Sequence, residues 1–169
     1  MLLEGCMTNK VLVVFYSYEG STRLMAKTIA QVIQADLLEC KPVKDIKSKG
    51  FTKYLWGSRQ VIFKKKPELE KFEKNPDDYD VIIIGTPVWA FNYTPTIRSF
   101  LTQVKLKNKK IGLFYCHEGG PGKTLENLKN ELSENTIVGE IDFLNVFENK
   151  EENIEKAKNW AIHLKEKNI

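Results

Sequence analysis

Three short segments of the chain are almost wholly apolar and rich in β-branched or aromatic residues. They are 11–16 (VLVVFY), 81–85 (VIIIG) and 110–116 (KIGLFYC). Segments of this kind suit strands that are covered on both faces, as in a parallel sheet. Each is followed, after a polar or glycine-containing loop, by apolar residues at helical spacing. Strands that alternate with helices in this way indicate an α/β fold with helices on both faces of the sheet.

The remaining segments complete one domain. Further strands are predicted at 36–40 and at 137–147, the latter with a bend near Asp142. Because right-handed crossovers leave few other arrangements, we expect a five-stranded parallel sheet in the order 2-1-3-4-5. The domain is predicted to span 10–169, with residues 1–9 as an N-terminal extension that shows no periodicity. Helices are predicted from Thr22, from Pro95, over 124–132, over 151–167 and over 52–63, within the long connection 41–80.

Composition excludes several classes of protein. A chain that is 42% hydrophobic and 28% charged has the make-up of an ordinary soluble domain. The net charge of +4 is spread along the chain, so we expect no nucleic-acid partner, and no apolar run is long enough to predict a membrane span. The three cysteines, Cys6, Cys40 and Cys116, are too widely spaced for a disulfide framework or a CxxC metal site. We expect no metal and a reducing, cytoplasmic setting.

The turn between the first strand and the first helix has the character of an anion site. It spans 17–22 (SYEGST), is rich in hydroxyl groups and contains a single glycine, Gly20. The first N–H groups of a helix have no partner within it, and they lie at the positive end of the helix dipole. A phosphate is the expected ligand. The alternative is an ordinary helix start with Ser21 or Thr22 as the N-cap residue.

Two other unusual loops should lie beside this turn. They are 86–93 (TPVWAFNY), after the third strand, and 117–122 (HEGGPG), after the fourth. In sheets with this strand order, ligands bind at the carboxyl ends of the strands, at the switch point between the first and third. The three loops should therefore converge on one edge, which favours the phosphate interpretation of the first loop.

From about Lys10 onward the chain resembles the flavodoxin family, whose members bind flavin mononucleotide (FMN) with a first-strand loop of pattern [ST]-x-T-G-x-T. Ser17, Gly20 and Thr22 fit this pattern, whereas Glu19 stands where the family often has Thr. The resemblance implies a flavodoxin-like three-layer sandwich and one FMN as the cofactor. A carboxylate at position 19 should weaken phosphate binding unless it points outward.

The resemblance extends to the other two loops. It implies that Trp89 stacks on the flavin ring, a contact that buries a large aromatic surface, and that the loop after the fourth strand closes over the other side of the ring. A core position for Trp89 is the alternative. The cofactor-binding residues implied are Ser17, Tyr18, Glu19, Gly20, Ser21, Thr22, Thr86, Pro87, Val88, Trp89, Ala90, Phe91, Asn92, Cys116, His117, Gly119 and Gly120.

Two residues where the fourth strand meets the third loop, His117 and Cys116, have more than one possible role. His117 next to a flavin would be able to donate a proton or orient a substrate, although a lone histidine is more often structural. Cys116 closes a buried strand and is expected to be an inert small hydrophobe. No other catalytic residue is predicted.

Three functions fit this sequence. The first is an electron carrier that serves a redox partner protein, and the second is an enzyme that uses NAD(P)H to reduce a small-molecule acceptor such as a quinone. The third is a binding module that has kept the fold without the flavin. Family carriers are typically strongly acidic, so a pI near 8.8 disfavours the carrier or implies acidic partners. The connection 41–80 is expected to supply the second helix of the fold, with a cover over the site or a homodimer surface as the alternatives.

Ala90 bears on the choice between the electron carrier and the reductase. The family often has Gly just after the stacking aromatic, where positive φ helps the ring accept a single electron. An L-residue resists that conformation by about 1–2 kcal/mol. Ala90 therefore favours two-electron chemistry and the reductase.

Overall fold

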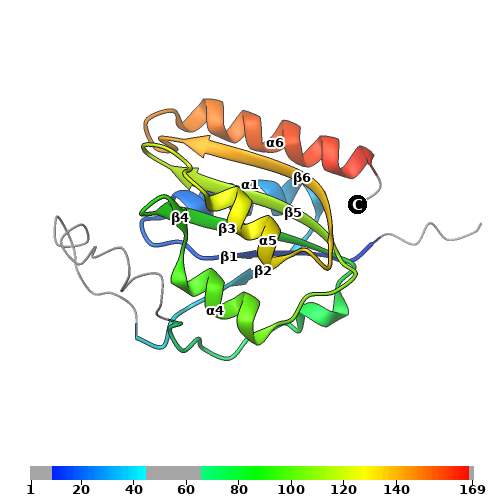
Figure 1. Cartoon of the computed structure of the whole chain (residues 1–169). Helices are drawn as coiled ribbons and strands as arrows, with labels where there is room; N and C mark the ends of the chain where they lie inside the picture. The colour runs from blue at the N-terminus through cyan, green and yellow to red at the C-terminus, as the bar shows by residue number, and fades with distance from the viewer. Residues whose placement is uncertain (1–8, 45–65, 168–169) are drawn as a thin grey trace, which may run out of the picture.

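The computed structural model describes residues 9–44 and 66–167 of the chain (Figure 1). The predicted helix over 52–63 and residues 1–8 of the predicted extension lie outside this part. In chain order the elements are β1 (Val11–Phe15), α1 (Ser21–Ile33), β2 (Asp36–Glu39), the single 3-10 turn η1 (Pro76–Asp78), β3 (Val81–Trp89), β4 (Asn92–Tyr93), α4 (Pro95–Gln103), β5 (Lys110–His117), α5 (Thr124–Glu131), β6 (Thr136–Leu144) and α6 (Lys150–Glu166).

The sheet confirms the predicted topology. Its parallel strands lie in the order β2-β1-β3-β5-β6, which is the order 2-1-3-4-5 once the short β4 is set aside. β4 pairs antiparallel with the end of β3. The predicted bend near Asp142 is wrong. The irregularity is a register shift opposite Ile111 and Gly112, which leaves Val138 as the extra residue of β6.

Alternate residues of each central strand supply two separate cores. In β1, Leu12 and Val14 face one core, to which α4 and α5 also contribute, whereas Val13 and Phe15 face the other, with α1 and α6. Figure 1 shows the sheet between these two layers of helices. Both faces of the strands are therefore apolar, as the unbroken apolar segments predicted.

The predicted loop 86–93 is wrong in its conformation. β3 continues to Trp89 and forms a hairpin with β4, in which Trp89 pairs with Asn92. The two residues of the turn, Ala90 and Phe91, have φ of 47° and 63°. Positive φ at both positions is the mark of a type I′ turn, which Asn-Gly or Asp-Gly usually signals. Neither residue is typical of that turn, so the hairpin could not be predicted from these residues.

Ala90 itself corrects a second expectation. We expected this residue to resist positive φ, yet it already has that conformation here. The turn is held by the start of α5, because the Lys123 N–H donates to the Phe91 carbonyl at 2.9 Å. Gly122, with φ of 54°, approaches so closely that a Cβ there would lie 2.3 Å from the Phe91 Cβ. These contacts offset the strain of the turn, so Ala90 does not favour two-electron chemistry.

Replacement of Ala90 by Gly should stabilise the protein. Relief of positive φ is worth about 1–2 kcal/mol, and the extra chain entropy of Gly removes about 0.5–1 kcal/mol of it. We therefore expect the free energy of unfolding in urea to rise by about 0.5–1 kcal/mol. Ala35, which does not have positive φ, is the matched control, and Ala35→Gly should lower stability. A loss of stability in both variants would contradict the strained turn.

Candidate functional site

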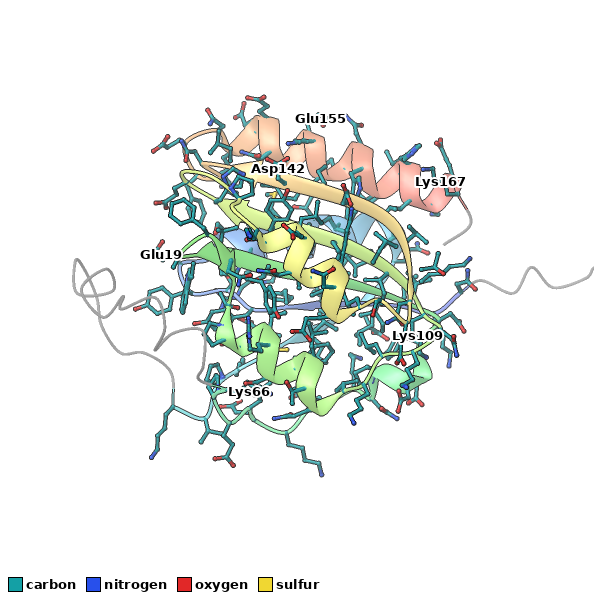
Figure 2. All side chains as sticks on the ribbon, viewed as in Figure 1. Glu19, Lys66, Lys109, Asp142, Glu155 and Lys167 are labelled. Carbon is teal, nitrogen blue, oxygen red and sulfur yellow. The ribbon has the colours of Figure 1, made fainter. Side chains whose placement is uncertain are left out.

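The ends of β1, β3 and β5 meet at one edge of the sheet. Phe15 pairs with Gly85, and Pro87 pairs with Cys116, so the segments that follow these strands begin side by side. Figure 2 shows Glu19 and Asp142 toward this carboxyl edge and Lys109 at the opposite one. The predicted convergence of the three loops is therefore observed.

The start of α1 contains a buried hydroxyl without an oxygen or nitrogen partner in the described part of the chain. Gly20 is the N-cap residue with φ of 105°, and no side chain caps the helix. The Gly20 N–H donates to Ser17 Oγ at 3.2 Å. Thr22 is fully buried, and its Oγ1 has no oxygen or nitrogen partner among the described residues; only the Cys116 thiol, a weak hydrogen-bonding group, lies beside it. The alternative of an ordinary helix start capped by Ser21 or Thr22 is therefore wrong, because both residues lie within the helix.

This arrangement suits an anion. A buried hydroxyl without a partner costs about 1–3 kcal/mol, so its presence calls for an explanation. The neighbouring N–H groups of the first helical turn and the helix dipole both favour a negatively charged group. A phosphate that accepted a hydrogen bond from Thr22 Oγ1 would remove the cost.

Side-chain charges contribute little to this anion site. Arg23 is in the first turn of α1, but its guanidinium pairs with Glu39 at 2.5 Å, and this hydrogen bond raises the pKa of Arg23. Glu19 is exposed, so its carboxylate is screened by solvent. The site therefore offers mainly neutral donors, and the repulsion expected from Glu19 is small.

Aromatic side chains from two loops gather beside the anion site. Trp89 is partly buried, and its ring centroid lies 5.7 Å from that of Tyr16 and 5.8 Å from that of Tyr18, both in edge-to-face contact. Phe91, at the hairpin tip, is 56% exposed. The structure thus joins the first and second loops through aromatic contacts. Sequence reasoning missed Tyr16, because it ends an apolar strand and looks like an ordinary core residue.

The end of β5 holds a histidine bound to a carboxylate. His117 Nε2 lies 3.1 Å from Asp142 Oδ2 of β6, and the His117 side chain is only 7% exposed. Lys156 of α6 lies 3.2 Å from the other oxygen of this carboxylate. Burial alone would raise the pKa of Asp142, but hydrogen bonds and positive charge from His117 and Lys156 hold it below its usual range. Sequence reasoning did not single out Asp142 or Lys156 for the site.

The geometry agrees with the family to which the sequence points. Residues 10–161 match the sequence profile of the flavodoxin family. The chain belongs to the flavodoxin family. Among solved structures, a protein from Bacteroides eggerthii DSM 20697 is 22% identical, with a TM-score of 0.73, over 92% of this chain and 98% of its own.

Two further structures share this fold. A flavoprotein from Lactobacillus acidophilus NCFM, solved in complex with FMN, is 22% identical over 85% of this chain and 97% of its own, with a TM-score of 0.65. The two-electron reduced Megasphaera elsdenii flavodoxin is 21% identical over 89% of this chain and 97% of its own, with a TM-score of 0.57. No curated protein matches the chain. At these identities the structures show the fold alone.

Hydrogen bonds within the second loop of this flavodoxin-family chain add to the contacts that hold its tip against the start of α5. Thr86 is fully buried, and its hydroxyl donates to the Pro87 carbonyl at 2.9 Å and accepts from the Thr94 N–H at 3.2 Å. It therefore clamps the hairpin, and a role in lining a ligand stays a prediction. Asn92 Oδ1 accepts from the Tyr93 N–H at 2.8 Å. Pro87, Val88 and Trp89 are each partly buried along β3.

In the third loop, Gly119 and Gly120 face open space, since a Cβ at either would meet nothing within 4 Å. Cys116 is 4% exposed and lies on the α1 side of the sheet. Burial raises the pKa of this thiol to about 12, and the nearby hydroxyls of Ser21 and Thr22 only partly oppose the rise. It is protonated at neutral pH, as an inert residue should be.

Within 9–44 and 66–167, no cluster of three metal-ligating side chains is present. In the same part of the chain, no helix combines the length and the apolar character needed to cross a bilayer.

Replacement of Thr22 by Val should leave the ligand-free protein as stable as before or make it more stable. The change keeps the shape of the side chain and removes a buried hydroxyl without a partner, whose burial costs about 1–3 kcal/mol. Thr86→Val is the matched control, because that hydroxyl is equally buried but hydrogen-bonded. Urea unfolding should show a loss of about 1 kcal/mol or more for the control alone. Equal losses in both variants would mean that Thr22 has a partner within the protein.

Proposed function

We propose that this protein binds one FMN, with the phosphate in the loop 17–22 and the flavin ring at the carboxyl edge of the sheet. The unsatisfied hydroxyl of Thr22 at the start of α1 is the observation that carries this proposal. It fits a phosphate at the position where the first-strand loop of the family binds one. The FMN complex of the Lactobacillus acidophilus flavoprotein, which has the same fold, adds support.

The ring would lie between the second and third loops. The hairpin β3–β4 would present Trp89 and the exposed Phe91 to one side of it, and Gly119 and Gly120 would let the backbone approach from the other. Bound FMN supplies the transfer of electrons singly or as a hydride. The protein's share is to hold the ring, shield it from water and handle protons beside it.

For the role in the cell, we propose a reductase that takes a hydride from NAD(P)H and reduces a small acceptor of the quinone type. Its basic charge, +4, departs from the acidic surface that steers typical carriers to basic partners. A histidine held by a carboxylate near the proposed ring position also suits chemistry that consumes protons.

The alternative is a one-electron carrier. It is favoured by Ala90, which already has the positive φ that we expected it to resist. A binding module without flavin is the third candidate.

The visible absorption spectrum of the purified protein is the first test. We expect a yellow protein with one flavin per chain that is released as FMN on denaturation. Release of flavin adenine dinucleotide would show that the site takes a different cofactor. Failure to retain added FMN would overturn the proposal and leave the binding module.

Turnover separates the two redox roles. The reductase should oxidise NAD(P)H in the presence of a quinone at a steady rate with FMN bound. A carrier should instead exchange electrons with a one-electron acceptor protein and show negligible oxidation of NAD(P)H. That second result would overturn the reductase while leaving the FMN site intact.

Thr22→Val should weaken FMN binding about ten- to a hundredfold, because a hydrogen bond to a charged phosphate is worth roughly 1.5–3 kcal/mol. Glu19→Thr should leave the affinity unchanged or raise it, since Glu19 is exposed and carries the same sign of charge as the phosphate. Titration of the apoprotein with FMN, followed by the quenching of flavin fluorescence, gives both affinities. A marked loss of affinity in Glu19→Thr would mean that Glu19 helps to hold the ligand.

A further inference from the structure

His117 has one ring nitrogen held and the other without a partner. Its side chain is 7% exposed, and Nε2 is bound to Asp142, whereas Nδ1 is buried and forms no hydrogen bond with any residue of 9–44 or 66–167. A buried polar atom left in this state costs about 1–3 kcal/mol. A purely structural histidine would be expected to satisfy both nitrogens, so the free Nδ1 points to a group outside the protein chain.

Asp142 determines which form the imidazole takes. One carboxylate oxygen faces His117, and the other lies 3.2 Å from Lys156 Nζ, which also donates to the Asp142 carbonyl at 2.7 Å. The pKa of Asp142 is lowered by these partners against the effect of burial, so the carboxylate is ionised at neutral pH. An ionised carboxylate only accepts hydrogen bonds, so Nε2 carries the hydrogen. Nδ1 is then an acceptor in the neutral ring and becomes a donor when the ring is protonated.

Two groups near His117 on this side of the sheet are neutral or already paired. The Tyr115 ring centroid lies 6.0 Å from that of His117, and burial together with nearby carboxylates raises the pKa of Tyr115, so it stays neutral. Glu140 is paired with Lys129. Among the described residues, the titratable or charged groups on the elements around His117 include Tyr115 on β5, Glu118 in the following loop, Lys129 on α5, Glu140 and Asp142 on β6, and Lys156 on α6.

The position of His117 in the sheet matches the proposed site of the flavin ring. It is the last residue of β5, next to Cys116, which pairs with Pro87 at the base of the β3–β4 hairpin. The imidazole therefore lies near the edge where Trp89 and the glycines of the third loop are placed.

We propose that His117 is the proton-exchanging residue of the flavin site, with Asp142 and Lys156 as its positioning residues. This inference rests on the proposed function. Bound FMN would supply the transfer of a hydride from reduced nicotinamide to a quinone, a two-electron reduction that one further proton completes. His117 would take this proton from solvent at Nδ1 and give it to the quinone, so that quinol forms and the imidazole returns to its neutral state.

The titration of the two histidines tests the proposal without any measurement of activity. The chain has two, His117 and the exposed His163 of α6, so the second is an internal reference in the same NMR spectrum. The imidazole signals of His117 should move toward those of a protonated ring when bound FMN is reduced with dithionite, because an opposite charge then lies close to the imidazole. The signals of His163 should not move. If the signals of His117 and His163 responded alike to reduction, the proposal would be overturned. The proposed function would still stand if the protein retained FMN.

Variants provide an independent measurement. His117→Asn keeps a hydrogen-bonding group near the position of Nδ1 but cannot titrate. It should retain FMN with an affinity within about threefold and lower the rate of quinone reduction about 100-fold or more. His163→Asn is the control and should change neither. An unchanged rate in His117→Asn would overturn the proposal, and failure of the wild type to bind FMN would overturn both it and the proposed function.

Discussion

Burial of the sheet on both faces is the constraint on which the rest of this structure depends. Alternate residues of β1 and β3 supply two apolar cores, so neither face of these strands is left for polar chemistry. Polar chemistry is therefore left to the ends of the strands. The side chains of Thr22, after β1, and of His117, at the end of β5, are buried at this edge, and each has a polar atom without an oxygen or nitrogen partner among the described residues. The fold thus determines where a ligand binds, and the side chains at that edge determine which ligand it is.

The elements that were predicted correctly from the sequence are those determined by local patterns. The segment 81–85 is apolar on both faces, so its assignment as a central strand needed no knowledge of the rest of the chain. The order of the strands followed from the alternation with helices and the handedness of crossovers. The turn 17–22 was also predicted correctly as the connection to a helix, since hydroxyl groups and a glycine between a strand and a helix suit an anion-binding turn.

What the sequence could not supply depends on contacts between distant residues. The hairpin after β3 was missed because Ala90 and Phe91 are poor residues for positive φ, and the contacts that hold them come from the start of α5. Asp142 could not be assigned to the site, because its partner His117 is 25 residues away. The free hydroxyl of Thr22 was likewise invisible, since only the packing around it shows that no partner reaches it.

The contact between Phe91 and Gly122 has a consequence for how this site can change in evolution. The hairpin tip and the loop before α5 touch so closely that no side chain fits at position 122 while Phe91 keeps its place. Insertions or substitutions in either loop must therefore be matched in the other, and the two cannot diversify independently. Across relatives that share this contact, the two loops should vary as a pair in length and composition, and a change of ligand preference should require coordinated substitutions in both.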